Sequence, residues 1–176
     1  MLGSAPGCAV HLVSDYDAQT DSDLSQLNTD LTAFVNKMIG AAGTPQGTYA
    51  ANRDFYLTQE AKVDTLIVRA QAYKSLNSCP STQLAAKAVS AAVPSSDISK
   101  YLDQMPKDDC SVVLLQLVKG GYIDLETFHQ AQGPKGIPAT AKDPILVGGL
   151  GALLRAAITV EVARKTAASA GGNNGS

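Results

Sequence analysis

The chain has 176 residues, enough for one domain with a sizeable core, since domains typically run to about 100–200 residues. Hydrophobic residues make up 45% of the sequence and aromatic residues 5%, with no tryptophan, a composition that favours packed helices over strands. Fourteen basic and sixteen acidic residues give a net charge of −2, which excludes the basic footprint of a nucleic-acid-binding protein. Three cysteines and two histidines leave few residues for a catalytic or metal centre.

The first charged residue is Asp15, and a cysteine preceded by small residues lies before it, in Ala5-Pro6-Gly7-Cys8. Bacterial lipoprotein signals end in a similar pattern, and their cysteine becomes lipidated. Ala5 stands where such signals usually have a large apolar residue. The alternative is a free cysteine in an N-terminal arm, residues 1–14.

The stretch Ser14-Asp15-Tyr16-Asp17 follows this cysteine and leads into a segment with regularly spaced apolar residues, Leu24, Leu27, Leu31 and Phe34. Over about the first forty residues the chain resembles small, uncharacterised bacterial envelope lipoproteins. The resemblance implies a lipid on Cys8 and a membrane-anchored protein outside the cytoplasm, with no activity attached. Ala9, which is not the aspartate associated with inner-membrane retention, extends this expectation to the outer membrane.

Apolar residues recur every three or four positions over residues 17–40, which predicts a long amphipathic helix. We expect Ser14 to cap it, with Asp17 at the capping-box position. Acidic residues near its start favour the positive end of the helix dipole, so they need no metal to explain them.

A second long helix is predicted over residues 49–76, because its apolar residues share one face. These are Tyr56, Val63, Leu66, Ile67, Ala70 and Tyr73. Glu60 and Asp64 lie one turn apart, a spacing that can bind a divalent cation. A solvated helical face with Lys62 nearby is the favoured interpretation.

Residues 81–132 predict several short helices, because prolines and a glycine pair interrupt the pattern. We expect Gly120-Gly121 to end one helix, a short helix over 122–132 to follow, and His129 to be a surface or capping residue. If Cys8 carries lipid, Cys79 and Cys110 remain as an even pair, and we predict a disulfide between them. The alternative is two buried thiols.

The last helix is predicted over residues 143–166, with Asp143 as its cap and Pro144 at its first position. Its uncharged run ends at Arg155, too early for the roughly 20 apolar residues of a membrane span. Residues 167–176 are expected to form a flexible tail.

Small residues on this last helix favour close helix packing, through a stripe formed by Gly148, Ala152 and Ala156. The other interpretations are a ligand groove, with Gly148, Gly151 and Ala152 as candidates, and self-association or membrane insertion. A phosphate-binding loop is disfavoured, because no lysine or serine of a P-loop follows the glycines.

We therefore expect an all-α helical bundle over residues 15–166, with about three long helices and several short ones. No catalytic or zinc-binding signature is found, so we expect no enzyme activity, cofactor or metal. The expected function is that of a lipid-anchored binding or scaffolding module in the cell envelope, with the membrane and possibly another envelope protein as partners. The alternative is a bundle that binds a small molecule or lipid on the glycine-rich face of the last helix.

Overall fold

The computed structural model describes residues 17–73 and 110–171, and in these ranges the chain is helical with no strand. Four long helices are present: α1 (Ala18–Gly40), α2 (Tyr49–Tyr73), α5 (Cys110–Gln132) and α7 (Gly149–Gly171). The short helix α6 (Lys142–Leu146) precedes α7, and three 3-10 turns lie in the connections, at Pro45–Gly47, Gly133–Lys135 and Ala139–Ala141. The all-α prediction is confirmed.

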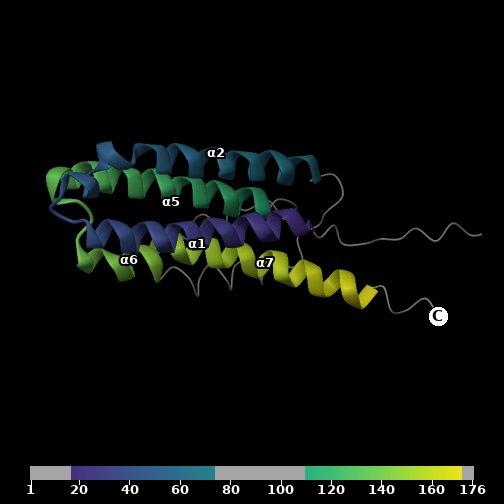
Figure 1. The fold of residues 1–176 in the computed structure, drawn as a ribbon. Helices are drawn as coiled ribbons and strands as arrows, with labels where there is room; N and C mark the ends of the chain where they lie inside the picture. The colour runs from purple at the N-terminus through teal and green to yellow at the C-terminus, as the bar shows by residue number, and fades with distance from the viewer. Residues whose placement is uncertain (1–16, 74–109, 172–176) are drawn as a thin grey trace, which may run out of the picture.

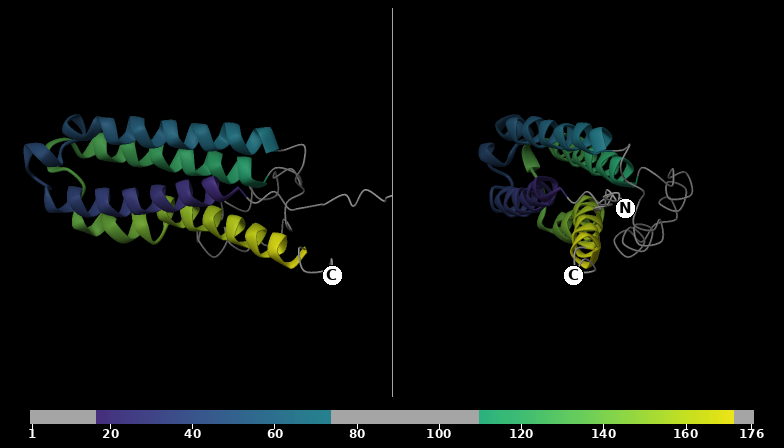
Figure 2. Two further views of the ribbon diagram at one scale, coloured as in Figure 1. Left: turned by 45° about the vertical axis from the view of Figure 1, so that its right-hand side comes forward. Right: turned by 90° about the vertical axis from the view of Figure 1, so that its right-hand side faces the viewer.

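The four long helices lie side by side and alternate in direction along the chain (Figure 1). The connections from α1 to α2 and from α5 to α6 meet at one end of the bundle, which we call the loop end (Figure 2). At the opposite end, called the open end, α1 and α5 begin and α2 finishes. Short connections between antiparallel helices are typical of an up-and-down bundle.

The core lies between the four helices and is formed by the apolar face of each. On α1, large apolar residues that recur about every three or four positions are buried. These are Leu24, Leu27, Leu31, Phe34, Val35 and Met38. The face predicted for the second helix is likewise confirmed at Tyr56, Val63 and Leu66. Burial of each large side chain contributes about 1.5–3 kcal/mol, so burial of these apolar faces is the main contribution to the stability of the fold.

Aromatic side chains fill the space between α1 and α2 towards the loop end. Phe34 and Phe55 stack with ring centroids 3.7 Å apart, and Tyr56 meets the Phe34 ring edge-on at 5.4 Å. These bulky rings interact through their edges and faces, and these contacts hold α1 and α2 together.

The start of α1 differs from the predicted capping box. Asp17 is itself the N-cap, and its carboxylate accepts a hydrogen bond from the backbone N–H of Gln19 at 3.0 Å. Ser14 lies outside the described residues. An aspartate cap satisfies a backbone donor of the first turn directly, so a further capping residue is not needed.

The predicted break at Gly120-Gly121 is wrong, because α5 continues through both residues and forms a fourth long helix. A glycine in a helix interior costs about 1 kcal/mol relative to alanine, which tertiary packing can outweigh. A Cβ atom on Gly121 would lie 3.0 Å from Leu150 Cδ1, so this glycine allows α7 to approach closely. The predicted short helices before Cys110 lie outside the described residues.

The predicted single helix over 143–166 is also wrong, because the chain breaks between α6 and α7. Gly149 has a φ of 32°, in the left-handed region that favours glycine. A Cβ atom on Gly151 would lie 2.2 Å from the carbonyl oxygen of Leu146, so only glycine fits at this bend. The Arg155 guanidinium donates hydrogen bonds of 2.7 Å to the carbonyls of Leu146 and Val147, which stabilises the end of α6.

The residues expected to start this last helix lie in α6 instead. Asp143 and Pro144 belong to its first turn, and the N-cap is Ala141, which provides no side-chain hydrogen bond. The Asp143 carbonyl accepts from the backbone N–H groups of Val147 and Gly148, at 2.8 and 3.0 Å. At its other end, α7 runs to Gly171, into the segment expected as a tail.

The stretch Ala139–Thr166 is long and apolar enough, by length and composition, to cross a membrane. In its most apolar 18-residue window, 44% of the residues are buried inside the bundle. Arg155 therefore does not by itself exclude a membrane span, although the sequence alone suggested that it did. Core helices of globular proteins have the same length and apolar composition, so these two properties do not by themselves indicate a membrane span.

Candidate functional site

An apolar groove of about 600 Å³ lies between α5 and the α6–α7 segment, partly open to solvent. The α5 wall consists of Val113, Gln116, Leu117, Gly120, Gly121, Asp124, Leu125 and Phe128. The opposite wall consists of Pro144, Ile145, Gly149, Leu150 and Leu153. This volume falls within the range of roughly 300–1,000 Å³ that is typical of small-molecule sites.

Glycines lie on both walls of the groove. Gly120 on α5 has open space around it, since a Cβ atom there would meet no atom within 4 Å. Gly149 is on the other wall, at the bend where α6 gives way to α7, and a Cβ atom there would lie 2.9 Å from the carbonyl oxygen of Pro144. The open position on α5 and the bend before α7, both unexpected features of the helices, thus border the groove.

The lining is apolar except for two side chains of α5, Gln116 and Asp124. Asp124 is exposed, and within the described ranges it forms no ion pair. Lys119, the nearest cation along α5, donates instead to Asp64 of α2 at 2.7 Å. The groove therefore presents a hydrophobic surface with one unneutralised negative charge.

The predicted ligand-groove residues do not line this groove. Gly151 and Ala152 are buried, and Gly148 lies at the bend before α7. Ala152 and Ala156 are at most 2% exposed, as expected for the close-packing interpretation of the small-residue stripe. The groove residues of α5 recur every three or four positions from Val113 to Phe128, a signal that the assumed break at the glycine pair concealed.

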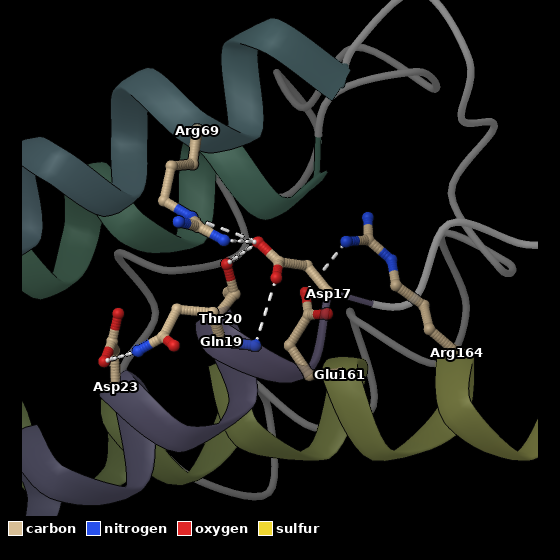
Figure 3. A network of polar contacts seen from close by, with 7 residues as sticks. All are labelled: Asp17, Gln19, Thr20, Asp23, Arg69, Glu161 and Arg164. Carbon is tan, nitrogen blue, oxygen red and sulfur yellow. Dashed lines mark hydrogen bonds and ion pairs between the residues drawn. The ribbon is translucent and has the colours of Figure 1, made fainter.

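A network of polar contacts lies at the open end of the bundle (Figure 3). Arg69 of α2 donates from Nε at 3.1 Å to the Asp17 carboxylate, which also accepts from Thr20 Oγ1 at 2.8 Å. Burial would raise the pKa of Asp17, but the hydrogen bonds from Arg69, Thr20 and Gln19 outweigh it and lower this pKa. The N-cap of α1 is thereby fixed to α2.

Glu161 of α7 is the most buried carboxylate in this network, with its side chain 3% exposed. Its Oε1 accepts from Arg164 at 2.8 Å and from Ser111 Oγ at 3.5 Å, whereas Oε2 has no hydrogen-bond partner among residues 17–73 and 110–171. Burial raises the pKa of Glu161, and the negative charges of Asp17 and Asp21 add to this effect, against the opposing charge of Arg164. A space of about 10 Å³ beside it matches one water molecule.

His129 lies in the core at the loop end, fully buried, so the prediction of a surface or capping histidine is wrong. Its Nε2 is 2.9 Å from the carbonyl oxygen of Gly47, which can only accept, so Nε2 carries the hydrogen. In the tautomer with its hydrogen on Nε2, Nδ1, 2.8 Å from Tyr56 Oη, accepts a hydrogen bond from that hydroxyl. Both ring nitrogens have hydrogen-bond partners, which indicates a structural role.

Of the two carboxylates considered for a cation on the second helix, Asp64 has a protein partner. Asp64 pairs with Lys119, and burial next to Glu126 raises the pKa of Glu60. Glu126 in turn accepts a 2.6 Å hydrogen bond from Tyr49 Oη. Among residues 17–73 and 110–171, no group of three or more histidine, cysteine, aspartate or glutamate side chains could hold a metal ion.

The cysteine predictions fall largely outside the described residues. Cys8 and Cys79 both lie there, while Cys110 is the first residue of α5. Lipidation of Cys8 and the Cys79–Cys110 disulfide therefore stay predictions.

Comparison of the chain with protein-family models, with curated proteins and with solved structures gave no match.

Proposed function

We propose that this protein is a non-enzymatic binding module, and that the groove between α5 and α6–α7 holds an apolar small molecule. The observation that carries the proposal is the groove itself, about 600 Å³ with a largely hydrophobic lining. Apolar pockets with a few polar groups at fixed positions are the usual form of small-molecule sites.

The chemistry of the lining favours binding over catalysis. Asp124 is the one ionisable side chain among the described lining residues. General acid–base catalysis and covalent catalysis both use a titratable group or nucleophile with a partner that activates it. A lone exposed carboxylate on a hydrophobic wall can orient a ligand, but it has no such partner.

The proposal places this module outside the cytoplasm, anchored to the envelope membrane by a lipid on Cys8. This placement is based on the small residues before Cys8, the Ser-Asp-Tyr-Asp stretch after it and the resemblance to envelope lipoproteins. A tethered bundle with an apolar groove would take up its ligand at the membrane surface. A scaffolding role towards another envelope protein stays an expectation from the sequence.

Binding can be tested with the neutral fluorescent probe N-phenyl-1-naphthylamine, whose emission rises in apolar surroundings. The wild-type protein should enhance its fluorescence. Gly120→Phe should abolish the enhancement, because a ring at this open position fills the groove, while Gly120→Ala should preserve it. Circular dichroism should show that both variants are folded. Equal probe binding by Gly120→Phe and wild type would refute the groove as the site.

Lipid attachment is tested separately by labelling the full-length gene product with radioactive palmitate in its bacterial host. Label should enter the wild-type protein and be lost in Cys8→Ala. A wild-type protein without label would overturn the anchor and leave the binding proposal intact.

A further inference from the structure

We infer that the ligand of the groove is an amphiphile with one long hydrocarbon chain and a cationic head, and that Asp124 selects the head. This inference rests on the proposed function and gives it a ligand class. Two observations support it, namely the length of the apolar lining and the charge on the wall of the groove.

The groove follows most of the length of α5. Its lining runs from Val113 to Phe128, and at 1.5 Å of rise per residue these positions lie about 22 Å apart along the helix axis. Apart from Gln116 and Asp124, the lining is apolar along this length. The site is thus a long apolar groove.

This shape suits an extended hydrocarbon chain. With bonds of about 1.5 Å and angles near 111°, such a chain advances about 1.25 Å per carbon. Asp124 and Val113 lie about 16 Å apart along the α5 axis, so a chain whose head lies at Asp124 has room for about 13 carbons.

The charge on the wall determines the preferred head group. Asp124 is exposed, lines the groove and has no ion-pair partner among the described residues. No lysine or arginine is found among the described lining residues. A fatty carboxylate would be repelled by this wall, whereas an ammonium head would be attracted.

The test is competition with N-phenyl-1-naphthylamine by straight-chain primary amines of 8 to 20 carbons, each below its micelle-forming concentration. Affinity should rise about two- to fourfold per added carbon, reach its maximum near 12–14 carbons and then level off. At equal chain length the amine should bind about two- to fivefold more tightly than the carboxylate in wild type. In Asp124→Asn this preference should vanish.

The outcomes separate this inference from the proposed function. Probe binding without dependence on chain length would overturn the single-chain site and leave the apolar groove in place. An unchanged preference for the amine in Asp124→Asn would overturn the role of Asp124. Failure of the wild-type protein to bind the probe would overturn the proposed function and the inference with it.

Discussion

His129 connects three parts of the loop end through two hydrogen bonds. Its ring joins α5 to Tyr56 on α2 and to the carbonyl of Gly47 in the turn between α1 and α2. Because all the groups involved are buried or held in a tight turn, loss of one partner leaves another without a hydrogen bond. Unsatisfied buried groups cost more than the hydrogen bond itself contributes to stability.

We predict that Tyr56→Phe lowers the free energy of unfolding by about 1–3 kcal/mol, because His129 Nδ1 loses its donor. Tyr49→Phe, which removes a part-buried hydroxyl from Glu126, should cost about 0.5–1.5 kcal/mol. Urea denaturation followed by circular dichroism measures both values. A Tyr56→Phe protein as stable as wild type would contradict the assigned role of His129.

The folding stability of the protein also depends on pH, through Glu161. Its pKa is raised in the folded state above the ordinary value of 4.5, chiefly by burial. The stabilising contribution is therefore fully present below about pH 4.5 and is lost as the pH rises through the folded-state pKa. Asp17, with its lowered pKa, acts in the opposite direction and contributes stability that is lost only in acid.

We predict that Glu161→Gln removes the Glu161 component while leaving that of Asp17. Between pH 4 and 8, the melting temperature of wild type should fall relative to that of Glu161→Gln as the pH increases. Thermal melts of both proteins in matched buffers measure this difference. A constant difference over the whole range would contradict a raised pKa for Glu161.

At the scale of helices, glycines have opposite effects at two positions. Gly151 lies at the bend between α6 and α7, where a Cβ atom would collide with the Leu146 carbonyl. Gly120 lies in the middle of α5, with open space around it. The first glycine is required by the backbone path, and the second only lowers the intrinsic stability of its helix.

We predict that Gly120→Ala raises the free energy of unfolding by about 0.5–1 kcal/mol, because alanine favours the helix and meets no neighbour. Gly151→Ala should destabilise the protein by about 1–3 kcal/mol, since a contact of 2.2 Å forces the bend to shift. Chemical denaturation of the pair provides the measurement. The reverse order of stabilities would show that the bend is not where the structure has it.

For the molecule as a whole, the sequence predicted the fold class and most of the core face, but not the groove. Leu24, Leu27 and Leu31 follow a periodicity that only a helix can place on one side, so this face was predictable. Local rules failed at Gly120-Gly121 and at Gly151, because tertiary packing decides whether a glycine continues or bends a helix. The groove depends on both outcomes together.

The same dependence on tertiary packing explains where His129 and the candidate ligand residues lie. His129 lies next to Gln130 and near Glu126 in the sequence, and its hydrogen-bond partners Tyr56 and Gly47 are 73 and 82 positions away. Gly148, Gly151 and Ala152 were the candidates for a ligand groove, but the groove is lined by Gly149, Leu150 and Leu153 instead. Contacts between distant segments could not be inferred from one sequence.

The central claim is that an apolar ligand occupies the groove between α5 and α6–α7. It is tested most directly by NMR of the protein labelled with ¹³C in its leucine methyl groups, during titration with N-phenyl-1-naphthylamine. The methyl signals of Leu117, Leu150 and Leu153 should shift with the probe concentration, while those of Leu27 and Leu31 on α1 should not. Unchanged signals from the three groove leucines in the presence of bound probe would contradict the account.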